Sequence, residues 1–231
     1  MAIAANDFKL PSAELRRIMV DRQVRTFDVT DQIVIARMLD VGREHFVEPS
    51  QRALAYSDLA LDVAGDAGPS TRTMLPPFVV ARMLQAVEPR KSDRALDVCG
   101  GAGYTAALLA GLCASVVAIE PDGTLFARAK AAFSDLALRN VTPLGLPLGK
   151  LSADLGPFDL IIVNGAVEDG LEKLADLLAP DGRMVAIVPK PSGATSAALI
   201  KGRGRDMSVR PLFDAAAPVL SEMRKAPAFV L

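Results

Sequence analysis

The stretch from Ala95 to Gly103 constrains the fold of this chain more than any other. A short apolar strand predicted at 95–98 leads directly into the glycines Gly100, Gly101 and Gly103, and an apolar helical stretch follows over 104–112. Glycines let the backbone of such a turn approach a ligand, and the next helix offers free N–H groups at its start. A strand, a glycine turn and a helix in this order indicate a nucleotide-type site in an α/β protein.

Further strands and helices alternate downstream of this turn. Apolar strands are predicted at 116–119, 141–144, 158–163 and 184–188, with helices beginning at Pro121 and near Leu171 and a turn at 180–182. Alternation of this kind implies βαβ units joined by right-handed crossovers. We therefore expect a mostly parallel, twisted sheet with helices on both faces. Segments 208–213 and 226–231 are candidate antiparallel edge strands.

The first ninety residues have a different character, with helices and loops only. Helices are predicted to begin at Ser12, acting as an N-cap, at Thr30–Asp31, and at Pro76–Pro77, the last ending before Pro89. We expect residues 1–90 to form a helical extension that covers a core formed by residues 91–231, in one compact unit.

Composition excludes several classes of protein. The 26 basic and 27 acidic residues leave a net charge of −1, which provides no electrostatic footprint for nucleic acid, and 51% hydrophobic residues argue against disorder. Two cysteines, Cys99 and Cys113, and the single His45 suit neither a disulfide framework nor a metal site. No apolar run approaches the ~18 residues of a membrane span. The expected location is the cytoplasm, where thiols stay reduced.

Two acidic residues narrow the choice of ligand. Asp97 immediately precedes the turn, and Glu120 ends the next strand, 17 positions after Gly103. A carboxylate before the turn would repel a phosphate but attract a cation, whereas one after the second strand can accept hydrogen bonds from ribose hydroxyls. This combination suits S-adenosylmethionine, which has a ribose, no phosphate and a positive sulfonium. Considered singly, Asp97 could be a capping residue and Glu120 a solvated strand end.

Several motifs resemble those of the protein-L-isoaspartate O-methyltransferase family. The similarity covers roughly residues 15 to 190. The motifs are Leu96-Asp97-Val98-Cys99-Gly100-Gly101-Ala102-Gly103-Tyr104-Thr105-Ala106-Ala107, Met19-Val20-Asp21-Arg22-Gln23-Val24-Arg25, Arg43-Glu44-His45-Phe46-Val47, Ala55-Tyr56-Ser57-Asp58, Pro157–Val163 and Leu178–Arg183. The resemblance implies a Rossmann-like methyltransferase fold and transfer of a methyl group from S-adenosylmethionine to the carboxylate of isoaspartyl residues in damaged proteins. The implied partner is a protein or peptide that carries such a carboxylate.

The predicted site follows from the turn and from this resemblance. Asn164 is included because it follows the fourth predicted strand, at a carboxyl-terminal strand end where ligands collect in such sheets. The residues expected to bind the cofactor are Asp97, Cys99, Gly100, Gly101, Gly103, Tyr104, Glu120 and Asn164. Thr73 is the candidate on the acceptor side, and no metal is expected.

The chain departs from the family pattern at three places. The family's Thr-x-Ser-Gln-Pro segment is Thr73-Met74-Leu75-Pro76-Pro77 here. Leucine cannot donate a hydrogen bond and proline also removes a backbone donor, so a more apolar acceptor pocket is expected. Cys99 replaces the usual first glycine of the turn. Leu146-Pro147-Leu148 stands where the family often has Gly-Asp-Gly, so a polar contact to adenine is expected to be lost.

Two other functions remain open at this point. The first is a non-catalytic scaffold that kept the fold and lost the chemistry, because all three departures fall at ligand-facing positions. The second is a NAD-dependent oxidoreductase, which the G-G-x-G spacing and Asp97 disfavour. His45 is expected to be a packing or surface histidine and not a general base, Cys113 is expected in the core, and the basic run 201–205 in an exposed hairpin turn.

Overall fold

A seven-stranded sheet forms the centre of the protein in the computed structural model, which describes residues 10–63 and 72–226. The strand order is β5-β4-β3-β6-β7-β8-β9, and the first five strands are parallel while β8 and β9 are antiparallel. The strands are β3 (Arg94–Val98), β4 (Ser115–Ile119), β5 (Val141–Leu144), β6 (Phe158–Ala166), β7 (Leu178–Pro189), β8 (Thr195–Lys201) and β9 (Ser208–Asp214). This confirms the predicted mostly parallel sheet.

The helices and a small second sheet complete the described fold. The helices are α1 (Ser12–Met19), α2 (Gln32–Asp40), α3 (Pro77–Val87), α4 (Tyr104–Ala110), α5 (Gly123–Asp135) and α6 (Leu171–Ala175), and the π-helical turn η1 (Val20–Val24) continues α1. Strands β1 (Leu61–Asp62) and β2 (Thr73–Met74) pair antiparallel to each other.

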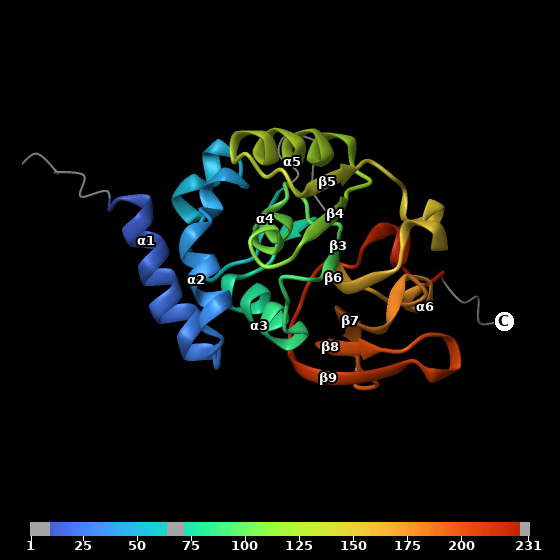
Figure 1. The fold of residues 1–231 in the computed structure, drawn as a ribbon. Helices are drawn as coiled ribbons and strands as arrows, with labels where there is room; N and C mark the ends of the chain where they lie inside the picture. Colours follow the sequence, from blue (N-terminus) through green and yellow to red (C-terminus); the bar gives the residue numbers. More distant parts are fainter. Residues whose placement is uncertain (1–9, 64–71, 227–231) are drawn as a thin grey trace, which may run out of the picture.

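The two faces of the large sheet are covered unequally. Side chains alternate along each strand, so Ala95 of β3 joins one hydrophobic cluster and Leu96 joins the other. The first cluster contains residues from α1 to α5, and the second contains α6, Leu148 and Met223. Figure 1 shows the N-terminal helices packed to one side of the sheet, α5 across one end, and β8 and β9 at the other.

The N-terminal helices are joined to the sheet layer by hydrogen bonds as well as by this shared core. Arg37 of α2 donates to the carbonyl oxygens of Ala107 (2.5 Å) and Leu108 (3.1 Å) in α4. Within the extension itself, the side chain of Gln85 in α3 accepts from the backbone N–H of Thr30 (2.7 Å). The helical extension therefore lies against α4, the helix that follows the glycine turn. The domain boundary near residue 90 stays a prediction.

Several local predictions need correction. Helix α5 begins at Gly123 and not at Pro121, because the Asp122 carboxylate accepts from Leu125 N (2.9 Å) and caps the helix. Ser12 lies inside α1 and makes no capping hydrogen bond. The segment 180–182 interrupts the register of β7 instead of preceding that strand. Strand β8 was not predicted at all, because its sequence follows no regular alternation.

Other predictions for the outer parts of the chain have mixed outcomes. Edge strand β9 and the exposed 201–205 turn are confirmed, as are the surface position of His45 and the buried position of Cys113. Most of the candidate strand at 226–231 lies outside the described residues. Within residues 10–63 and 72–226 no helix is long and apolar enough to span a membrane.

Candidate functional site

The glycine turn lies at the point where the strand order reverses. From β3 the chain proceeds through β4 to β5 on one side, whereas β6 and β7 lie on the other side. Ligands in open α/β sheets bind beyond the carboxyl ends of the strands at such a point. Asp97 lies near the carboxyl end of β3, Asn164 near that of β6, and Glu120 directly follows β4, so the fold brings these three residues to one region.

The glycines of the turn are required by their surroundings. A Cβ atom at Gly100 would lie 2.1 Å from Oδ2 of Asp97, so the carboxylate occupies the space that any side chain would need. Gly101 and Gly103 have φ angles of +62° and +98°, in the left-handed region that favours glycine. A Cβ atom at Gly103 would also lie 2.5 Å from the ring of Phe133. The turn therefore packs tightly against both the acid before it and helix α5.

Asp97 is held by a buried hydrogen-bond network. Asn164 Nδ2 donates to Asp97 Oδ1 (2.7 Å) and to the carbonyl oxygen of Val98 (3.0 Å), and Thr105 Oγ1 donates to Asn164 Oδ1 (2.6 Å). Burial raises the pKa of Asp97 to about 7, although the hydrogen bond from Asn164 opposes the shift. Asn164 therefore connects β6, β3 and α4, and it lies next to Asp97. That these two residues bind a cofactor stays a prediction.

Glu120 accepts hydrogen bonds from the turn and from the start of α5. Its Oε2 accepts from Gly101 N (2.9 Å) and its Oε1 from Asp122 N (3.1 Å). Oε2 also forms an ion pair with the guanidinium of Arg72. Burial raises the pKa of Glu120, and the positive charge of Arg72 opposes this. Glu120, the predicted acceptor for the ribose hydroxyls, is thus held against the glycine turn and is already paired with the guanidinium of Arg72.

Two cavities adjoin the turn. One of about 10 Å³ is lined by Asp97, the three turn glycines, Glu120 and apolar side chains such as Ile119 and Phe126. This volume is about that of a single water-sized sphere. A second, of about 240 Å³, is lined by Arg72, Cys99, Pro121, Asp122, Leu148, Leu220, Ser221 and Glu222. A nucleoside can therefore occupy the smaller cavity only if side chains move.

Cys99 and Tyr104 differ in how well they suit the predicted cofactor contact. Cys99 has a φ of +58°, the conformation that a glycine would adopt without strain, and it lines the larger cavity. Burial raises the pKa of its thiol to about 12, so the thiol stays protonated. The Tyr104 ring instead lies in the core against Phe46, with 5.5 Å between ring centroids. The cofactor contact predicted for Tyr104 stays a prediction, and with the ring in the core that contact would come from the backbone.

The segment Thr73–Pro77, on the expected acceptor side and called the acceptor segment below, is held by Arg43. Leu75 is buried, and its carbonyl oxygen accepts from the guanidinium of Arg43 (3.1 Å), which also donates to Ala55 O (2.8 Å) and lies over the Tyr104 ring. Among the described residues, Thr73 Oγ1, Arg43 Nη1 and Tyr104 Oη are buried atoms without a hydrogen-bond partner. Buried polar atoms without a partner therefore lie in and around this segment.

The segment Leu146–Leu148 is apolar in its packing as well as in its sequence. Leu146 and Leu148 both pack in the cluster on the face of the sheet covered by α6. Side chains that face the smaller cavity from β4, β5 and α5, including Ile119, Phe126 and Pro143, are also apolar. The expected loss of a polar adenine contact stays a prediction, and these surroundings agree with it.

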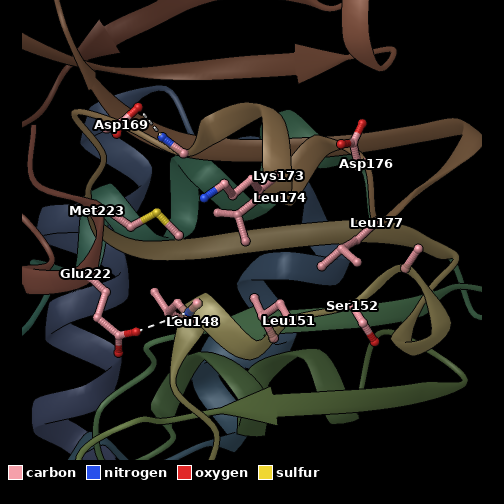
Figure 2. A pocket seen from close by; sticks show the side chains of 13 residues that line it. Leu148, Leu151, Ser152, Asp169, Lys173, Leu174, Asp176, Leu177, Glu222 and Met223 are labelled. Carbon is pink, nitrogen blue, oxygen red and sulfur yellow. Dashed lines mark hydrogen bonds between the residues drawn. The ribbon is translucent and has the colours of Figure 1, made fainter.

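A further cavity shares Leu148 and Glu222 with the cavity that Cys99 lines. Figure 2 shows this space, of about 240 Å³, between α6 and the turns that follow β5. Leucines such as Leu151 and Leu174 line it, and at its edge Glu222 accepts from Gly149 N (3.2 Å). No residue of the predicted site lines it, and we assign it no role.

Three residues of the site escaped prediction from the sequence. Arg72 and Arg43 lie far from the turn along the chain, and no local motif marks their contacts with Glu120 and with Leu75. Thr105 is part of the glycine motif, but its contact with Asn164 depends on the pairing of β3 with β6. Only the tertiary arrangement identifies these three.

The fold and the acid-flanked glycine turn define a class, the Rossmann-like methyltransferases. A solved protein-L-isoaspartate O-methyltransferase superposes with a TM-score of 0.76 at 22% identity, covering 91% of this chain and 66% of that one. A Plasmodium falciparum structure described as such an enzyme in complex with S-adenosyl-L-homocysteine also gives 0.76, at 19% identity, covering 93% and 100%. At these identities the likeness concerns the fold.

The sequence comparisons identify the family. The profile of protein-L-isoaspartate(D-aspartate) O-methyltransferase matches residues 16–211. A protein-L-isoaspartate O-methyltransferase of Bradyrhizobium sp. strain BTAi1 is 33% identical over 204 residues, covering 88% of this chain and 93% of the relative. One of strain ORS 278 is 38% identical over 178 residues, covering 77% and 80%. The chain belongs to the protein-L-isoaspartate(D-aspartate) O-methyltransferase family, which confirms the predicted resemblance.

Proposed function

We propose that this protein transfers a methyl group from S-adenosylmethionine to the carboxylate of isoaspartyl residues in proteins or peptides. One observation carries the proposal: the fold brings Asp97 and Glu120 to the two sides of one glycine turn, in a chain of this family. Family membership favours this enzyme over a non-catalytic scaffold or a NAD-dependent oxidoreductase. The cytoplasmic location remains part of the proposal.

The residues at the turn fit this cofactor chemically. When bound, S-adenosylmethionine supplies a methyl group made electrophilic by the positive sulfonium. The carboxylates of Asp97 and Glu120 are acceptors of opposite charge to it, and no Lys-containing phosphate loop is present in the glycine motif. Glu120 would accept from the ribose hydroxyls, and Asp97, aligned by Asn164, would attract the cationic methionyl end. The backbone of Gly100–Gly103 would lie against the ligand.

The acceptor side needs little acid–base chemistry. A carboxylate is already a nucleophile, so positioning and exclusion of water supply most of the rate enhancement. Thr73 Oγ1 has no hydrogen-bond partner among the described residues, and its hydroxyl would donate to the acceptor. The buried Leu75 side chain would exclude water. Arg43 would act on this segment indirectly by holding the Leu75 carbonyl.

A methyl-transfer assay tests the proposal directly. Radiolabelled S-adenosylmethionine is incubated with an isoaspartyl peptide and, as the matched control, with the same peptide containing normal aspartate. We expect base-labile methyl ester on the isoaspartyl peptide only. Absence of ester on both peptides, at cofactor and peptide concentrations in the millimolar range, would refute the proposal.

A further inference from the structure

Arg72 occupies the position where the ribose of a cofactor is expected to bind. Its guanidinium pairs with Glu120 Oε2, and the two side chains are only 11% and 4% exposed. The other oxygen of this carboxylate accepts from Asp122 N, and Oε2 also accepts from Gly101 N. Both oxygens are therefore engaged within the protein. Ribose hydroxyls can reach this carboxylate at full strength only when the guanidinium leaves.

The position of Arg72 in the chain indicates which anion its guanidinium can pair with after it leaves Glu120. Arg72 directly precedes β2 (Thr73–Met74), so it adjoins the acceptor segment. Among the described residues that line the two cavities at the glycine turn, Arg72 is the one cation. The acceptor of the proposed reaction is an anion, whereas Leu75 and Pro76 provide no side-chain donor.

We infer that Arg72 exchanges partners, pairing with Glu120 before the cofactor binds and with the acceptor carboxylate afterwards. A guanidinium matches a carboxylate through two parallel N–H donors and fixes its plane. In the methyl ester the negative charge is gone, so the attraction to Arg72 is lost and product release is favoured. This inference rests on the proposed function and adds a specificity-determining residue to it.

Among the residues that the structure describes in this cavity, two other carboxylates compete for the guanidinium. Asp122 and Glu222 line the same cavity as Arg72. Each already accepts a backbone N–H, Asp122 from Leu125 (2.9 Å) and Glu222 from Gly149 (3.2 Å). If Arg72 moved to either of them, it would not contact the acceptor. The experiment therefore has to measure binding of the cofactor and of the acceptor separately.

The partner exchange predicts effects of opposite sign from one substitution. In Arg72→Met the competitor for Glu120 is gone, so S-adenosylhomocysteine should bind about threefold to tenfold more tightly in isothermal titration at pH 8. The labelled isoaspartyl peptide, in saturating S-adenosylhomocysteine, should bind at least about tenfold more weakly by fluorescence anisotropy, the loss expected for one charge-assisted hydrogen bond. Arg72→Lys keeps the charge and should lose less peptide affinity.

A control variant shows whether the effects are specific to Arg72, and defined results would overturn the partner exchange. Arg203→Met removes an exposed arginine of the β8–β9 turn and should change neither affinity. Weaker binding of both ligands by Arg72→Met, or unchanged peptide binding, would overturn the partner exchange. If Arg72→Met does not fold, equal peptide affinities of wild type and Arg72→Lys overturn it. Wild-type turnover with these results leaves the proposed function intact, whereas a wild type that binds no cofactor refutes both.

Discussion

The polar groups on the cofactor side of the site have partners, whereas several on the acceptor side have none. Asp97 and Glu120 each accept at least one hydrogen bond within the protein. Around β2, buried atoms of Thr73, Arg43 and Tyr104 have no hydrogen-bond partner among the described residues. Buried polar groups are normally paired, so unpaired ones at a site point to water or a ligand as the partner. The polar groups on the cofactor side are thus already held by partners within the protein, whereas those on the acceptor side depend on what binds there.

Removing the Glu120 carboxylate should give the largest effect and would break the cofactor side. Two charge-assisted hydrogen bonds to a ribose contribute about 3 kcal/mol or more together, so Glu120→Ala should weaken S-adenosylmethionine binding by roughly 100-fold or more. Isothermal titration measures this. Asp206→Ala, at an exposed carboxylate of the β8–β9 turn, is the control and should bind normally. An unchanged affinity in Glu120→Ala would place the ribose elsewhere.

Adding one methyl group to the glycine turn should give the next largest effect. In Gly100→Ala the new Cβ would lie 2.1 Å from Asp97 Oδ2, so the carboxylate has to move. Overpacking of this kind costs about 2 kcal/mol, which corresponds to roughly 30-fold in cofactor affinity if Asp97 binds the ligand. Gly123→Ala is the matched control, because no atom lies within 4 Å of its Cβ position. Equal cofactor affinities of the two variants would contradict the role of Asp97.

The pH dependence of binding should be smaller and should report on Asp97. Its pKa is raised from 3.8 to about 7, so the folded protein holds this proton more tightly than the unfolded chain. Stability should therefore fall as pH rises from about 4 to about 7 and then level off. Cofactor affinity should change in the opposite direction and rise about tenfold between about pH 6 and pH 8, because the ionised carboxylate attracts the cation.

The Asp97→Asn variant supplies the control for both pH effects. It cannot ionise, so its stability and its weakened cofactor affinity should lose this part of their pH dependence, which chemical denaturation and isothermal titration can follow. A wild-type affinity that stays constant between about pH 6 and pH 8 would show that the ionisation of Asp97 is not linked to binding.

Thr73→Val should give the smallest effect, and it tests the acceptor side of the comparison. The Thr73 hydroxyl has no hydrogen-bond partner among the described residues, so the variant should unfold within about 0.5 kcal/mol of wild type. If the hydroxyl donates to the acceptor, kcat/KM for the isoaspartyl peptide should fall about fivefold, since the carboxylate loses its charge as it is methylated and the hydrogen bond then contributes about 1 kcal/mol. Cofactor affinity should not change. Unchanged kcat/KM would remove Thr73 from the site.

Much of the cofactor side could be predicted because its elements are local in the sequence. The glycine motif, the acid before it and the acid after the next strand lie within about 25 residues, and parallel strand pairing brings their ends together. The apolar strands and the helices at positions 32–40 and 77–87 followed from periodicity and capping. The start of α5 was misplaced because an Asp cap and a preceding Pro are both helix-start signals, and the structure uses the cap.

The sequence by itself determined the fold class, the family and the ligand type of the glycine turn, since each of these depends on residue order over short distances. Only the tertiary structure decided which charges meet across long distances. The pairing of Arg72 with Glu120, the hold of Arg43 on Leu75 and the bridge from Asn164 to Asp97 join residues 32 to 67 positions apart. Such contacts depend on how layers pack, and pairing over these separations leaves no periodic signal in the chain.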